Sequence, residues 1–153
     1  MDPDMFVSSF PEELRNSIPI VNYPPPVHSV IEKNEHKFIV DGPAKIIASG
    51  KSTVETVINS PAIVRATSNS KVHVDAHAPT VVHASKNSTV SIHTTTNILI
   101  DGNDYSNIEL AIAEQCNSDV LLDIAGNSTV TCSGNTSIIQ KQYKSGDATI
   151  RKQ

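Results

Sequence analysis

Hydrophobic and polar positions alternate along most of this chain, and the alternating runs return every eighteen residues. Residues 61–69 and 79–87 share nearly the same pattern, each starting with proline and ending with asparagine. The stretch between them, 70–78, has its own copies, which start at Ser52 and Ser88. A fixed period of this length is typical of architectures built from stacked repeats. The pattern therefore predicts a solenoid.

Each eighteen-residue coil contains two runs with a period of two, which predicts two β-strands per coil. In the first run, the side chains predicted to point inward are Val54, Thr56, Ile58; Val72, Val74, Ala76; Val90, Ile92, Thr94; Ile108, Leu110 and Ile112. In the second run they are Ala44, Ile46, Ala48; Ala62, Val64, Ala66; Thr80, Val82, Ala84; Ile98, Ile100, Gly102; Val120, Leu122 and Ile124. These columns predict an all-β, single-chain parallel β-solenoid (β-helix) with about 18 residues per coil. The general preference of parallel crossovers favours the right-handed sense.

The repeat accounts for residues 34–153, a domain of about six coils. The coils begin at Asn34, Ser52, Ser70, Ser88, Ser106 and Ser128. The fifth coil is longer by the four residues 115–118, which predicts one loop insertion. A last half-coil, 146–151, predicts that Ala148 and Ile150 lie in register with Val130 and Cys132. Asparagine tolerates the left-handed conformation of a sharp corner, so the corners are assigned to Asn69, Asn87 and Asn127.

Residues 1–33 do not follow the repeat and are predicted to form an extended N-terminal docking arm. Ser9 and Glu12 have the spacing of a capping box, and apolar side chains recur every four residues, which predicts a short amphipathic helix. A proline-rich segment with polyproline-like geometry follows the helix. The arm either packs over the open first coil or docks on another subunit. The residues assigned to docking are Phe6, Phe10, Leu14, Tyr23, Pro24, Pro25 and Pro26.

One position departs from clean alternation, because an apolar residue stands between two inward residues in the second strand of successive coils. These residues are Ile63, Val81, Leu99, Leu121 and Ile139. Alternation turns them outward, and a monomer rarely exposes an apolar stripe of that length. The stripe is therefore predicted to be a self-association surface. The alternatives are a second buried layer under the N-terminal arm and an error in the assigned register.

Histidines provide the candidate metal ligands. His73, Asp75 and His77 alternate on one outward edge, and the period places His93 one coil above Asp75. Imidazoles with a carboxylate can hold a transition metal, but polar outward residues on a solenoid are normally only solvated. We predict no metal or cofactor here. No phosphate-binding loop, nucleophile elbow or His-Glu-x-x-His motif occurs, and the acidic residues are scattered, so the chain is not predicted to be an enzyme.

Composition narrows the functional class further. With 12 basic and 16 acidic residues the formal charge is −4, which gives no footprint for nucleic acid or an anionic membrane. The N-terminus has no apolar signal region, so synthesis in the cytosol without secretion is expected. The two cysteines, Cys116 and Cys132, do not form a disulfide framework, and Cys132 falls at a core position of the repeat.

The run from Val72 to Ile92, with its Val/Thr/Ala-Pro-Thr phrasing, resembles β-helical virion proteins of tailed phages, such as spikes. This resemblance covers about residues 34–150 and is compositional. It implies a structural or attachment component of a virus particle, assembled in the host cytoplasm as a trimer or other homo-oligomer. The arm would then anchor the chain to another virion protein.

A weaker resemblance is to bactofilins, polymerising cytoskeletal solenoids with a similar coil length and proline-containing tails. Bactofilin coils are rich in glycine, whereas this chain has 6 glycines in all. A third interpretation is a phage-encoded inhibitor that binds a host protein. Self-assembly of the purified chain and copurification with a host protein separate these classes.

Overall fold

The computed structural model describes residues 27–30, 35–42, 44–116 and 120–152. Within these residues the chain forms two seven-stranded parallel sheets. Sheet A contains β1 (Val27–Val30), β3 (Ala44–Ala48), β5 (Ala62–Ala66), β7 (Thr80–Ala84), β9 (Ile98–Gly102), β11 (Val120–Ile124) and β13 (Ile139–Lys144). Sheet B contains β2 (Glu35–Val40), β4 (Thr53–Ile58), β6 (Lys71–Ala76), β8 (Thr89–Thr94), β10 (Asn107–Ile112), β12 (Thr129–Gly134) and β14 (Thr149–Lys152).

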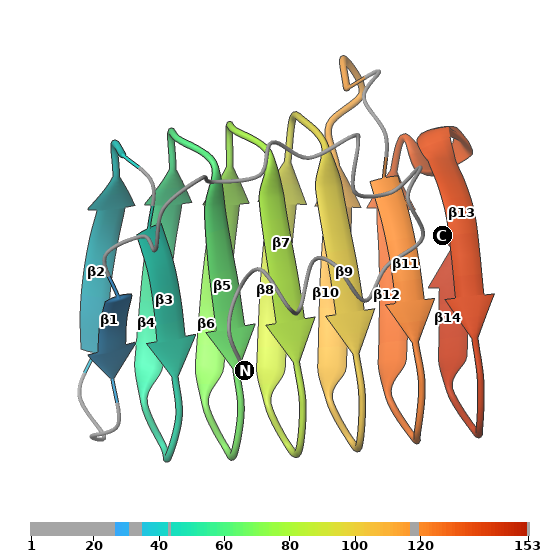
Figure 1. Ribbon diagram of the computed structural model, residues 1–153. Coiled ribbons are helices and arrows are strands. Elements are labelled where there is room, and N and C mark those ends of the chain that lie inside the picture. Colours follow the sequence, from blue (N-terminus) through green and yellow to red (C-terminus); the bar gives the residue numbers. More distant parts are fainter. Residues whose placement is uncertain (1–26, 31–34, 43, 117–119, 153) are drawn as a thin grey trace.

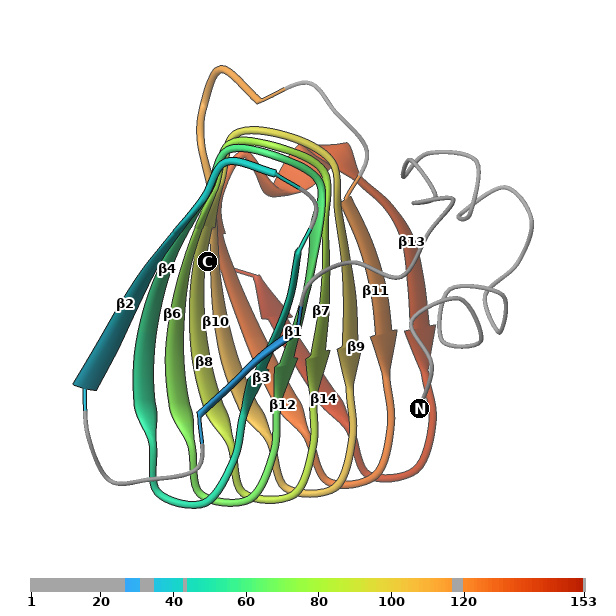
Figure 2. The ribbon, with the colours of Figure 1, turned by 60° about the vertical axis from the view of Figure 1, so that its left-hand side comes forward.

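Successive coils stack along one axis, and every described strand pairs with a strand of the neighbouring coil in its own sheet (Figure 1). The two sheets face each other across a continuous core and are joined by turns at both margins (Figure 2). The predicted parallel β-solenoid with about 18 residues per coil is therefore confirmed. None of the helices among the described residues is long and apolar enough to span a membrane.

The core consists of columns of side chains that point between the sheets at the same register position in successive coils. Val64 on β5 and Val82 on β7 are register partners, and both are fully buried. The same alternation buries every second residue of the central strands, as the period of two requires. We call such a set a core column.

The corners that lead from sheet A to sheet B contain two sets of residues, namely buried serines and residues with left-handed backbone. The serines that begin the coils, Ser52, Ser70, Ser88, Ser106 and Ser128, are all buried. The hydroxyls of Ser52, Ser70 and Ser128 donate to the carbonyl three residues earlier, as Ser70 Oγ does to Thr67 O at 2.8 Å. The left-handed corner residues are Gly50, Ser68, Lys86, Asp104, Gly126 and Gly146. The prediction that the following asparagines take this conformation was wrong.

The solenoid begins and ends differently from the prediction. β1 pairs with β3, so the first strand of sheet A lies inside residues 1–33, which the sequence assigned to the arm. The predicted helix and docking residues of that arm lie outside the described residues. The predicted loop insertion agrees with the register, because Ile98 pairs with Val120 and the frame then resumes.

The last half-coil was assigned to the wrong register. Ile150 pairs with Val130, and Lys152 pairs with Cys132. A short 3₁₀ turn, η1 (Thr136–Ile138), precedes β13, and the pairing of β13 shifts by one residue between Val120 and Leu121. These two irregularities lengthen the coil, so that Gly146 follows Gly126 as the left-handed corner.

Candidate interaction surface

The outer face of sheet A contains the apolar stripe that the sequence predicted. Ile63, Val81, Leu99 and Leu121 are register partners on β5, β7, β9 and β11. Val81 and Leu99 are 1% exposed, and Leu121 is 3% exposed, although none of the three belongs to the core between the sheets. Within one chain these side chains thus form a separate shielded layer, and residues 1–26 of the N-terminal arm, which one interpretation placed over it, lie outside the described residues. Contact of this stripe with another copy stays a prediction.

Ile139 does not extend the stripe. The segment before β13, which contains η1, is one residue longer than the period, so Ile139 pairs with the core residue Val120. The extra residue after Ile139 then pairs Lys141 with Leu121. The side chain of Ile139 packs against the core cluster and is partly buried. At the other end, the register partner of Ile63 is the buried Lys45. Lysine positions therefore border the stripe at both ends.

A polar column runs beside the stripe, two residues further along each strand. It contains Arg65, His83, Asp101 and Asp123 in register on successive strands. His83 Nδ1 lies 2.5 Å from Asp101 Oδ2, and the two side chains are only 18% and 21% exposed. The sequence analysis missed this pair, although the eighteen-residue separation of His83 and Asp101 was a signal that could have identified it.

Among the residues whose side chains the structure describes, Asp123 is the last member of this polar column. Burial raises the pKa of Asp123 above its ordinary value, and the negative charge of Asp101 raises it further. A half-buried carboxyl group next to a second carboxylate is costly to ionise, because the two like charges repel in a region of lowered dielectric. The face of sheet A therefore combines a shielded apolar stripe with a partly desolvated ionisable column.

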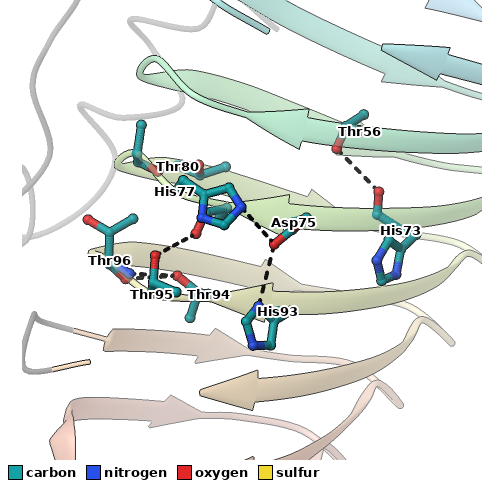
Figure 3. Close-up of polar contacts among 11 residues, drawn as sticks. Thr56, His73, Asp75, His77, Thr80, His93, Thr94, Thr95 and Thr96 are labelled. Carbon is teal, nitrogen blue, oxygen red and sulfur yellow. Dashed lines mark hydrogen bonds and ion pairs between the residues drawn. The ribbon is translucent and has the colours of Figure 1, made fainter. Parts of the chain in front are cut away.

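The predicted histidine cluster lies on the opposite sheet (Figure 3). His77 Nε2 lies 3.2 Å from Asp75 Oδ1, and His93 Nδ1 lies 3.4 Å from the same oxygen. His93 is the register partner of Asp75, as the period predicted. His73 lies two residues before Asp75 on the same strand, and its carbonyl accepts a hydrogen bond from Thr56 Oγ1 at 3.2 Å.

These distances describe two imidazoles directed at one carboxylate oxygen. The side chains of Asp75, His77 and His93 are 34%, 44% and 47% exposed, so water competes for each contact. Among the residues that the structure describes, no group of three or more His, Cys, Asp or Glu side chains has a geometry suited to a metal ion. Metal binding by His73, Asp75, His77 and His93 stays an untested interpretation of the sequence.

An open groove of about 660 Å³ follows the outer face of sheet B near its N-terminal end. Its lining includes the hydroxyls of Thr53, Thr89 and Ser91, the ammonium groups of Lys37 and Lys71, the imidazole of His73 and the carboxylate of Glu55. Among the described residues that line the groove, Glu55 is the one carboxylate. The groove offers hydrogen bonds and mixed charges, without the paired carboxylates used in glycoside hydrolysis.

The docking residues assigned to the N-terminal arm, namely Phe6, Phe10, Leu14, Tyr23, Pro24, Pro25 and Pro26, lie outside the described residues. Both cysteines are buried free thiols, as expected for Cys132 at a core position. Comparison with known proteins adds no relative: no protein-family description matches the chain, and neither a curated protein nor a solved structure matches it.

Proposed function

We propose that this chain is a non-enzymatic structural protein, a stiff β-solenoid that joins an assembly through the outer face of sheet A. The apolar stripe is the observation that carries the proposal. Ile63, Val81, Leu99 and Leu121 form an apolar row in register that faces away from the core between the sheets. Since Val81 and Leu99 are already shielded from water within one chain, a partner would have to replace the present cover of this row. Outward apolar side chains in a continuous row are characteristic of a protein contact surface, because a solvated face carries polar residues.

The polar groups of the described residues support a structural class. On sheet B, His77 and His93 share one oxygen of Asp75, and all three side chains are partly open to water. On sheet A, the ion pair of His83 and Asp101 borders the stripe. Both His93 and His83 contact an aspartate of the adjacent coil, and such contacts between stacked strands fit a structural role.

Self-association through the stripe is tested by replacing Val81 and Leu99 together with glutamate. Buried unpaired carboxylates disfavour any contact made by this face, so the variant is expected to have a lower mass than the wild-type homo-oligomer in light scattering. The matched control is Thr53→Glu with Thr89→Glu, which adds the same charges at exposed positions of sheet B. The milder variant Val81→Ala with Leu99→Ala gives a folded protein in case the glutamates unfold the chain.

Two results would overturn this part of the proposal. A monomeric wild-type protein at micromolar concentration would exclude self-association through the stripe. An unchanged mass in both stripe variants, combined with a lower free energy of unfolding, would make the stripe an internal layer of one chain. In that case the solenoid would still be a structural element, but its contact surface would lie elsewhere.

We infer that the assembly is a virus particle, with the chain as a structural or attachment component that also binds another particle protein. This finer assignment is supported by the resemblance of residues 72–92 to phage β-helical proteins alone. The test is quantitative mass spectrometry of purified particles from a phage-producing culture. The chain is expected at a stoichiometric ratio to the major capsid protein, and recovery in the soluble cell fraction alone would contradict the assignment.

A cytoskeletal scaffold similar to bactofilins is the second candidate. The observation that favours it is the pairing at the two ends of the solenoid: among the described strands, β2 pairs only with β4 and β14 only with β12. Unpaired strand edges are templates for adding further strands, and addition in parallel would lengthen the rod. Negative-stain microscopy of the purified chain separates the candidates, because a polymerising scaffold forms filaments and a fixed-length rod does not.

A further inference from the structure

The last coil of the solenoid interrupts one core column in each sheet. In sheet B, one column passes in register through Thr56, Val74, Ile92, Leu110 and Cys132, and all five side chains are at most 2% exposed. The next position in this column, on β14, is Lys152, whose side chain is exposed. A charged residue thus occupies a position that is uncharged and buried in the five preceding coils.

The same change occurs in sheet A. Its column passes through Ala48, Ala66, Ala84, Gly102 and Ile124, and the four residues with side chains are fully buried. The extra residue of β13 shifts the register, so that Ile124 pairs with Lys144. Lys144 is exposed as well. The β-bulge therefore has a specific result: it brings a second lysine to a core position at the same end of the rod.

At the opposite end both columns begin with an apolar residue, since Val30 on β1 pairs with Ala48 of the sheet A column. Phe38 on β2 occupies the column of Thr56 and packs partly buried against the core. Val40, two residues later, pairs with Ile58 and is 5% exposed. In the column of Thr56 the two ends of the solenoid thus differ in chemistry, with the aromatic ring of Phe38 in the first coil and the ammonium group of Lys152 in the last.

The ammonium charge of Lys152 affects Cys132, its register partner in the same column. Burial raises the pKa of the Cys132 thiol, and the nearby Lys152 ammonium partly offsets this rise. If another coil were added on β13 and β14, both ammonium groups would be covered and would lose water without gaining a carboxylate partner. Desolvation of an unpaired charge is one of the largest penalties in protein association. Inward charged residues on edge strands are also a known protection against strand addition.

We propose that the last coil is a charged cap, in which Lys144 and Lys152 prevent another copy of this chain from adding end to end. The cap disfavours strand addition on β13 and β14 and leaves the side faces available for association. This inference concerns the ends of the rod and does not depend on the proposed role of the apolar stripe. It also distinguishes the chain from a polymerising scaffold, whose ends must accept new subunits.

The test restores both columns with the double variant Lys144→Ile and Lys152→Val. In this variant the last coil presents an apolar end, and we expect filaments of constant width in negative-stain micrographs and a mass that rises with protein concentration. Wild-type protein is expected to give short particles whose mass is independent of concentration in the same range. Circular dichroism checks that both proteins keep the β-sheet fold.

The matched control is Lys51→Ile with Lys71→Val, which removes the same charges at exposed positions outside the core columns and should form no filaments. The single variant Lys152→Thr copies the buried Thr56 of the same column and should shift the mass in the same direction as the double variant. The proposal is overturned if wild-type protein already forms end-to-end filaments, if the folded double variant keeps the wild-type mass, or if the control variant polymerises equally.

Discussion

Val64 on β5 and Val82 on β7 are register partners on adjacent coils, and neither side chain is exposed to solvent. Each coil therefore contributes to a core that it cannot complete alone. The inward side chains of its two strands are shielded from water by the side chains of the coils on either side. In such a stack, stability depends on contacts between adjacent repeats, and damage to one coil weakens both coils beside it.

Shortening Val82 in this column is expected to destabilise the whole rod. Val82→Ala removes two buried methyl groups and should lower the free energy of unfolding by about 2 kcal/mol in urea denaturation. Val82→Asp should prevent folding, because it buries a carboxylate between apolar neighbours. The control is Thr89→Ala on the following strand, an exposed outward position, where the change should stay within about 0.5 kcal/mol. Equal effects of Val82→Ala and Thr89→Ala would contradict the column.

Gly134 is needed at the end of β12 because of its backbone geometry. Its φ is +80°, and a Cβ at this position would lie 1.9 Å from the carbonyl oxygen of Ile112 on the adjacent strand. Gly134→Ala is therefore expected to cost more than about 2 kcal/mol in the same assay. Gly42 provides the matched control, since a Cβ there meets nothing within 4 Å. Gly42→Ala should be neutral or slightly stabilising, and a comparable loss at both glycines would refute the steric explanation.

The sequence alone was sufficient to predict the repeating part of the fold. The period of two predicts that Val64 and Val82 both point inward, and the eighteen-residue spacing assigns them to one column. Both patterns can be read without the structure, because the first is a property of a single strand and the second follows from the stacking of equal coils. The corners were harder to assign. Left-handed backbone occurs at Ser68 and Lys86, which carry no glycine signal, so the asparagine that follows each of them was the more obvious choice.

The last coil shows where the reasoning from periodicity fails. The longer segment before β13 moves Ile139 out of the stripe, and the extra residue after Ile139 moves Lys144 into a core column. A bulge of this kind leaves no hydrophobic pattern that marks it beforehand. The shielding of Val81 and Leu99 was also not decided by alternation, which gives the direction of a side chain but not what covers it. Both features depend on contacts beyond a single strand.

The contact between His83 and Asp101 is expected to stabilise the outer face of sheet A. Both side chains are mostly buried, so a double-mutant cycle with alanine at each position should give a coupling energy of about 1–2 kcal/mol near pH 7. His93 and Asp75 form the comparison cycle, because they occupy the same one-coil relationship at 3.4 Å but are 47% and 34% exposed. Their coupling should be below about 0.5 kcal/mol. A larger coupling for the exposed pair would show that burial does not determine these contacts.

Asp123 should make stability depend on pH in a defined direction. Its pKa is raised in the folded chain by burial and then by Asp101, so the folded carboxyl binds a proton more readily than the unfolded one. The cost of its charge is therefore present in full above the folded pKa and is relieved as the pH falls through that value. Asp123→Asn, which removes the charge, is expected to raise the free energy of unfolding at pH 7 by up to about 1 kcal/mol.

The same argument predicts that the advantage of Asp123→Asn shrinks on acidification and is gone once the pH lies below the ordinary carboxyl value of 3.8. Urea denaturation of both proteins across this pH range measures the difference. Asp147→Asn, at an exposed corner position, is the control and should change stability by less than about 0.5 kcal/mol throughout. A benefit of Asp123→Asn that is constant with pH, or a loss of stability at pH 7, would mean that Asp123 is stabilised by a partner in its ionised form.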